Sequence, residues 1–259
     1  MLFRRHHIIV GLLALFLSAS AQAVPFLQLD IEGGTYVGGN EESVMTNDKI
    51  FTLYAHALRG TKKMSDADLL GEDFFIAAAL TPKDGFDGTG LHDLGTFDVT
   101  FTDVMGNRVT ETIDVTADMV FGVPPLEPTN NNLHDGGDLP KHDIYETWFK
   151  EIAFRFTGDN TSGEYNVQDD AGLGAIAGTD MYFETFEFDL TNLDSPYNLY
   201  FDLYSIRIKN ETDYDVDYHA PFSKNAGTDI WVSVPLPNTL LVLVTGLFLL
   251  GVGQRRTPR

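Results

Sequence analysis

In the stretch Phe51-Thr52-Leu53-Tyr54-Ala55-His56-Ala57, apolar side chains recur at every second position. Successive side chains of a β-strand point to opposite faces, so this alternation predicts a strand with one buried face and one wet face. The same pattern recurs in four other segments, whose apolar members are Phe97, Val99 and Phe101; Ile113, Val115 and Ala117; Ile152, Phe154 and Phe156; and Phe186, Phe188 and Leu190. Half-buried strands of this kind are typical of antiparallel sheets.

The stretch from Leu199 to Lys209 changes its apolar face partway along. Leu199, Phe201 and Leu203 share one side, whereas Ile206 and Ile208 lie on the other. A one-residue shift turns every following side chain to the opposite face, so the pattern predicts a β-bulge, or a strand crossing between sheets, near Ser205.

Turn-forming residues separate the alternating segments, at Gly33-Gly34, Gly38-Gly39-Asn40, Asp84-Gly85, Gly106-Asn107 and Gly158-Asp159-Asn160. Together these signals predict an all-β fold, a two-sheet antiparallel β-sandwich of about eight to ten strands in one domain. Jelly-roll and immunoglobulin-like strand orders both remain open. A short helix is expected from Ser65 to Leu70, where Ser65 is a suitable N-cap, and the stretch from Ile144 to Lys150 is ambiguous.

The N-terminus has the features of a secretory signal peptide. Arg4 and Arg5 precede an apolar run from Ile8 to Leu17, and Ala21-Gln22-Ala23 forms an A-x-A cleavage site. We therefore expect residues 1–23 to be removed after export by the Sec machinery, which leaves Val24 as the first mature residue. An uncleaved N-terminal anchor is the alternative.

The C-terminus has the order of a short motif, an apolar helix and a basic tail. Residues 239–253 form 15 uncharged positions, a marginal span against the roughly 20 residues that cross a bilayer core. Pro235 and Pro237 mark the start of this helix, and Arg255 and Arg256 in the tail 254–259 would stay on the cytoplasmic side. An ordinary single-pass anchor is one reading, and a processed sorting signal over residues 234–259 is the other.

The motif Val234-Pro235-Leu236-Pro237, followed by this helix and by Arg255-Arg256, resembles a PEP-CTERM sorting signal, with Leu236 where the name-giving motif has Glu. The resemblance implies transient membrane insertion of residues 239–253 and cleavage near Pro235–Pro237 by an exosortase. It also implies a Gram-negative bacterium, whose cell envelope, cell surface or extracellular matrix would receive the protein.

The region between the two ends, residues 24–233, resembles the choice-of-anchor N family of exported bacterial proteins. Six blocks carry the resemblance: Val24–Leu29, Asp118–Glu127, Gly136–His142, Tyr145–Glu151, Phe201–Tyr204 and Ala220–Ser223. Directly after the last block, Lys224-Asn225 stand where the family pattern has His-Asp. The family has no established biochemical activity, so the resemblance implies export and anchoring without a reaction.

The exported region is strongly acidic and contains no cysteine. It carries 12 basic and 38 acidic residues, a net charge of −26. This charge opposes binding to nucleic acid and to anionic lipid, and it is compatible with divalent cations or with neutral or cationic polymers. Without cysteine there are no disulfides, so an apolar core must stabilise the fold.

Two groups of residues are candidate metal ligands. His134, Asp138 and His142 could converge because Gly136-Gly137 lets their loop fold back, and Asp213, Asp215 and Asp217 would share one face of a strand. The alternatives are a solvated loop and a wet strand face. We expect no cofactor, with Ca²⁺ as the one candidate ion.

The sequence favours a non-catalytic protein. Ser43, Ser162 and Ser223 lie in no G-x-S-x-G motif, and no carboxylate pair is singled out for glycoside hydrolysis. One alternative is a carbohydrate-binding module that takes extracellular polysaccharide, either through Ca²⁺ or through an aromatic platform, and a secreted hydrolase is a third hypothesis. The candidate platform residues are Trp148, Tyr197, Tyr200, Tyr214, Tyr218 and Trp231.

Overall fold

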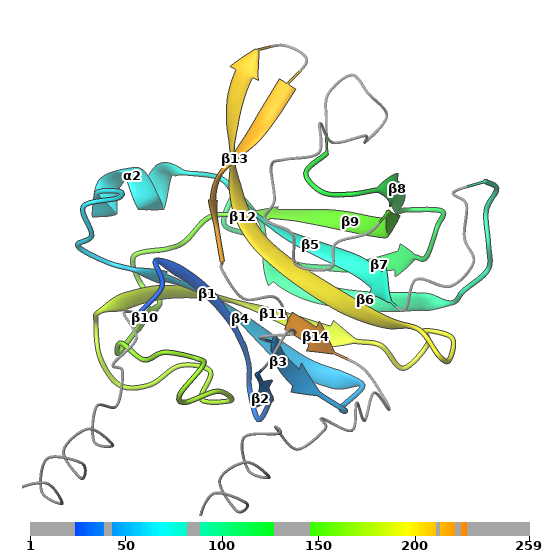
Figure 1. Cartoon of the computed structure of the whole chain (residues 1–259), viewed down its shortest axis with the longest axis horizontal. Coiled ribbons are helices and arrows are strands. Elements are labelled where there is room, and N and C mark those ends of the chain that lie inside the picture. Colours follow the sequence, from blue (N-terminus) through cyan, green and yellow to red (C-terminus); the bar gives the residue numbers. More distant parts are fainter. Residues whose placement is uncertain are drawn as a thin grey trace, which may run out of the picture. The chain divides into compact units, whose positions relative to one another are not determined.

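The computed structural model describes residues 24–38, 43–81, 89–126, 146–210, 213–220 and 224–226, which form two β-sheets and a short helix (Figure 1). The smaller sheet has the order β1-β4-β11-β6-β7, and β10 pairs with β11. Its strands are β1 (Leu27–Ile31), β4 (Ile50–Leu58), β6 (Thr96–Thr102), β7 (Arg108–Asp114), β10 (Thr161–Ser162) and β11 (Met181–Asp189).

The larger sheet has the order β2-β3-β14-β12-β5-β9-β8, and β13 pairs with β12. Its strands are β2 (Thr35–Val37), β3 (Ser43–Thr46), β5 (Phe74–Thr81), β8 (Val120–Gly122), β9 (Thr147–Phe154), β12 (Asn198–Asn210), β13 (Asp213–His219) and β14 (Lys224–Ala226). The strand pairs of both sheets are antiparallel, except that β14 runs parallel to β3. The predicted all-β, mainly antiparallel fold is confirmed.

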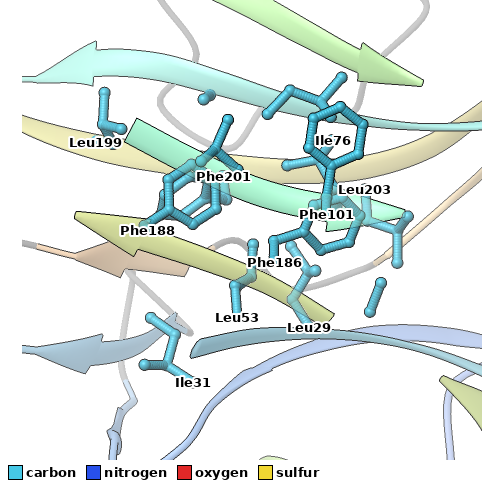
Figure 2. Packing of buried hydrophobic residues seen from close by; sticks show 14 of the residues in the cluster. Leu29, Ile31, Leu53, Ile76, Phe101, Phe186, Phe188, Leu199, Phe201 and Leu203 are labelled. Atoms are coloured by element: carbon cyan, nitrogen blue, oxygen red, sulfur yellow. The ribbon is translucent and has the colours of Figure 1, made fainter. Parts of the chain in front are cut away.

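The core lies between the two sheets, where apolar side chains of both point toward each other (Figure 2). Phe51 and Phe188 come from the smaller sheet and Phe201 from the larger one. Their ring centroids lie 4.6 Å apart for Phe188 and Phe201, 5.5 Å for Phe51 and Phe188, and 6.0 Å for Phe51 and Phe201. Leu53, Ala55 and Ala57 are fully buried, as the alternation of β4 predicts.

The predicted irregularity near Ser205 is confirmed. The register between β12 and β13 shifts between Ser205 and Ile206. Before the shift Leu199, Phe201 and Leu203 face the core, and beyond it residues 206–210 pair with 213–216 as a two-stranded arm that extends past the neighbouring strands (Figure 1). Ile208 on this arm is 68% exposed.

Two expectations about strands are wrong. The alternation at Ile113, Val115 and Ala117 does not continue a strand, because β7 ends at Asp114 and Thr116 has a φ of 73°. The Thr116 hydroxyl accepts a hydrogen bond from the N–H of His92 at 3.0 Å and donates one to the carbonyl of the same residue at 2.8 Å. This pairing with a residue 24 positions away holds a turn where the side-chain pattern alone predicts a strand.

The expected eight to ten strands are also too few, since the described residues form a six-stranded and an eight-stranded sheet. The additional strands have only two to four residues: β2, β3, β8, β10 and β14. Such short segments are too brief to show a period of two, so their pairing depends on neighbours distant in sequence.

The short helix is confirmed as α2 (Asp66–Gly71), where the side chain of Ser65 accepts a hydrogen bond from the N–H of Asp68. The ambiguous stretch enters strand β9 at Thr147. Residues 1–23 and 227–259 lie outside the described part of the chain, so the signal peptide and the sorting segment stay predictions. Among the described residues, no helix is long and apolar enough to cross a membrane.

Replacing Phe188 by Ala is expected to lower the free energy of unfolding by about 3 to 5 kcal/mol, because its fully buried ring joins the two sheets. Urea denaturation followed by circular dichroism measures the change. Ile208→Ala, on the exposed part of the arm, is the matched control and should change stability by less than about 0.5 kcal/mol. Equal losses in the two variants would contradict the assigned core.

Candidate functional site

The most connected polar cluster lies on the outer face of the smaller sheet, beneath the connection between β10 and β11, residues 163–180, here called the strap. The carboxylate of Asp30 is fully buried there and receives four donors. Its Oδ1 accepts the N–H groups of Ile31 and Gly172, each at 2.9 Å. Its Oδ2 accepts the N–H of Gly174 at 3.1 Å and the hydroxyl of Tyr165 at 2.8 Å. These donors satisfy a charge that would otherwise be costly to bury.

Tyr165 links this carboxylate to a buried histidine. Its hydroxyl oxygen lies 3.0 Å from His56 Nε2 and 2.6 Å from the carbonyl oxygen of Gly174. Because the single tyrosine proton is needed by the carboxylate or the carbonyl, we assign the imidazole proton to Nε2, which donates to Tyr165. The Nδ1 atom of His56 has no partner among the described residues, and burial lowers the pKa of the imidazole to about 3. The histidine is therefore neutral at physiological pH.

Strand β1 and two glycines hold the strap in place. The Gln28 side chain donates to the carbonyl of Tyr165 at 2.7 Å and accepts the N–H of Val167 at 3.3 Å. Gly172 has a φ of +86° and Gly174 a φ of +63°, and a Cβ at Gly172 would lie 2.5 Å from the carbonyl oxygen of Gly34. Side chains at these positions would be strained, so the glycines allow the backbone to approach Asp30.

This cluster contains acid and base groups, but their hydrogen bonds hold the strap against the sheet. The Asp30 carboxylate is fully buried and already accepts four hydrogen bonds, and His56 is also fully buried. A general base must reach a substrate proton, which a group closed off in this way does not do. Sequence reasoning did not single out Asp30, His56 or Tyr165. The available signal was a pair of polar residues, Gln28 and Asp30, alternating with leucine and isoleucine in a strand.

A second polar cluster lies on the outer face of the larger sheet. Ala77 of β5 pairs with Asp202 on one side and with Glu151 on the other, so the three share this face. Glu151 Oε1 accepts the hydroxyl of Tyr204 at 2.5 Å and the N–H of Leu126 at 2.8 Å. Asp202 is half-buried, and the loss of water around its carboxyl raises its pKa to about 7.

The same face carries a small apolar cluster, separate from the core between the sheets. Its buried members are Ala77, Ala79, Phe149 and Tyr204, against which Leu126 packs. The carboxyl of Asp202 thus stands among alanine and tyrosine side chains, a setting that disfavours its charged form. Of the carboxyl groups on this face, Glu151 binds a neighbouring segment through Leu126, and Asp202 accepts no hydrogen bond from any described residue.

Only some of the predicted metal ligands lie in the part of the chain that the structure describes. Asp215 Oδ2 lies 2.8 Å from Arg207 Nη2, and Asp217 Oδ1 lies 4.0 Å from Arg207 Nη1. A cation from the neighbouring strand therefore faces these carboxylates. Asp213 lies in β13, and His134, Asp138 and His142 lie outside the described residues. Within the described ranges no group of three or more His, Asp or Glu side chains could hold a metal ion.

The predicted platform residues do not form an exposed aromatic surface in the described part of the chain. Trp148 is 7% exposed and packs in the core. Tyr218 packs against Phe26 and donates its hydroxyl to the carbonyl of Lys63 at 3.0 Å. Tyr197, Tyr200 and Tyr214 are half-buried, and Trp231 lies outside the described residues.

Comparison with known proteins assigns no family: no family model, no curated protein and no solved structure matches this chain.

Tyr165→Phe is expected to lower the free energy of unfolding by about 1 to 3 kcal/mol, because it removes a donor from the buried Asp30 carboxylate and the partner of His56. Urea denaturation measures this loss, and limited proteolysis should show faster cleavage within the strap. Tyr218→Phe, which loses an exposed hydrogen bond, is the matched control with an effect below about 1 kcal/mol. Unchanged stability in Tyr165→Phe would show that the cluster does not hold the strap.

Acidification is expected to destabilise the protein partly through His56. Below pH 6.5 the unfolded chain gains a proton on this residue, whereas the folded protein does not until about pH 3. Stability is therefore lost as pH falls between these values, by up to about 1.4 kcal/mol per pH unit. The free energy of unfolding at pH 7 and pH 4.5, compared between wild type and His56→Gln, isolates this contribution. An identical pH dependence in both proteins would contradict it.

Proposed function

We propose that this chain is an exported, non-catalytic protein of the bacterial cell surface or extracellular matrix. An N-terminal signal peptide and a C-terminal sorting signal would target its single folded β-sandwich there. The observation that carries the proposal is the order of the segments. A signal-like segment precedes the sandwich, and a proline motif, an apolar stretch and an arginine tail follow it. This order is typical of tripartite signals that an enzyme reads and removes.

The positions of the two proposed cleavage points support this proposal. Cleavage after Ala23 leaves Val24, Pro25 and Phe26 ahead of β1, which starts at Leu27. Strand β14 ends at Ala226, before the motif that begins at Val234. Neither cut would remove a residue from a described strand, so processing would leave both sheets complete. Cleavage within a strand would instead remove backbone hydrogen bonds and core side chains.

The charge of the region 24–233 limits its partners. With a net charge of −26 it is repelled by anionic lipid surfaces and by nucleic acid. In the proposed setting, exosortase and the Sec machinery are processing partners, and a neutral or cationic extracellular polysaccharide is the polymer that this charge allows. No observation on the described residues favours the carbohydrate-binding module or the hydrolase over the non-catalytic function.

The mass of the intact protein from its own host tests the proposal. The extracellular fraction is expected to contain a species that begins at Val24 and ends near Pro235. Replacing Pro235 and Pro237 together by Ala should retain an unprocessed form in the membrane, because the proposed motif is lost. Pro258→Ala in the arginine tail is the matched control and should leave processing intact. A wild-type membrane species that still ends at Arg259, with no shortened form, would contradict the sorting signal.

A further inference from the structure

We propose that the carboxyl group of Asp202 is a pH-responsive element that controls how firmly residues 123–126 are held on the outer face of the larger sheet. The neutral carboxyl would favour the closed arrangement, and the ionised carboxylate would favour release of this segment. This regulation is independent of the proposed export and anchoring.

The held segment has a defined attachment point. Leu126 packs against the outer apolar cluster, and its N–H donates to Glu151 Oε1 at 2.8 Å. The same carboxylate oxygen accepts the hydroxyl of Tyr204, whose side chain is fully buried. Glu151 thus joins strand β9, strand β12 and the segment that follows β8. Weakening the hydrogen bond from Leu126 to Glu151 would loosen the segment from the sheet.

Asp202 stands close to this attachment without being part of it. It lies two residues before Tyr204 on β12 and shares the outer face with Glu151, on the opposite side of Ala77. No described residue donates a hydrogen bond to its carboxyl. An ionised Asp202 would place a second negative charge on a poorly hydrated face that already carries Glu151. Burial and the negative charges of Glu151 and Asp202 together raise the pKa of Tyr204, so the charge of Asp202 acts on the tyrosine whose hydroxyl bonds Glu151.

Among the described residues, the pairing of β12 with its neighbouring strands shows which other titratable groups face Asp202. Strand β5 presents Phe75, Ala77 and Ala79, none of which titrates, and β9 presents Glu151. Strand β12 itself adds Tyr200 and Tyr204, and β13 adds His219 opposite Tyr204. Strand β14 places Asn225, which does not titrate, opposite Tyr200.

The direction of the pH effect follows from burial. The pKa of Asp202 is raised to about 7 in the folded protein, whereas a carboxyl in water titrates near its usual value of about 3.9. Between these values the closed state holds a proton that the open state releases. The closed state therefore loses stability as the pH rises toward 7. Above pH 7, ionisation of Asp202 causes no further loss.

Hydrogen exchange of the full-length chain in detergent, at pH 5.5 and pH 8 and corrected for the intrinsic pH dependence of exchange, tests the proposal. A peptide covering residues 120–126, from which the uptake of a peptide ending at Val123 is subtracted, reports on the amide of Leu126, since Pro124 and Pro125 have none. Its protection should fall by up to about thirtyfold at the higher pH, relative to a peptide from β6 and β7. Asp202→Asn should abolish this fall, because the amide does not ionise.

Asp215→Asn is the matched control, since it removes a carboxylate of the same sheet that pairs with Arg207. This variant should keep the wild-type pH dependence. The urea midpoint provides a second measurement: that of wild type should decrease from pH 5.5 to pH 8 by more than that of Asp202→Asn. The proposal is overturned if wild-type protection of residues 120–126 does not change with pH, or if Asp202→Asn retains the full change.

Discussion

The contact of Phe51 and Phe188 with Phe201 is the interaction on which the rest of the structure depends, because it joins the two sheets in a chain without cysteine. A single sheet with one apolar face is not stable in water until that face is covered. Each sheet here covers the other, and the three rings lie where they meet. Aromatic pairs of this geometry add stability beyond the area that they bury. The polar clusters on the two outer faces depend on this packing of the sheets.

Both outer faces use a carboxylate to hold a segment against a sheet. Asp30 receives the backbone N–H groups of the strap, and Glu151 receives the N–H of Leu126. A buried carboxylate that accepts backbone donors can fix an irregular segment that lacks strand partners of its own. The same residue types suggest catalysis or metal binding when seen in a sequence. Here Asp30 and Glu151 have structural partners, the backbone N–H groups of the segments that they hold.

The long strands could be predicted from sequence because alternation around residues such as Leu53, Val99 and Phe188 is a local property. The shift at Ser205 and the N-cap Ser65 were equally visible, since each is a feature of a few consecutive residues. The strap cluster was not, because Tyr165 lies 135 residues from Asp30 and only the fold brings them together. The spacing of Asp215 and Asp217 indicated a shared acidic surface, but it could not show that Arg207, eight residues before Asp215, pairs with them across the β12–β13 hairpin.

Native-state hydrogen exchange most directly tests the claim that the two sheets stabilise each other. The slowest amides of β4 and β11 in one sheet, and of β5 and β12 in the other, should open with the same free energy, equal to that of global unfolding. They should also lose protection together as urea is added, because neither sheet persists without the other. If one sheet stays protected after the other has exchanged, the sheets are separate folding units, and the aromatic contact is not what holds this protein together.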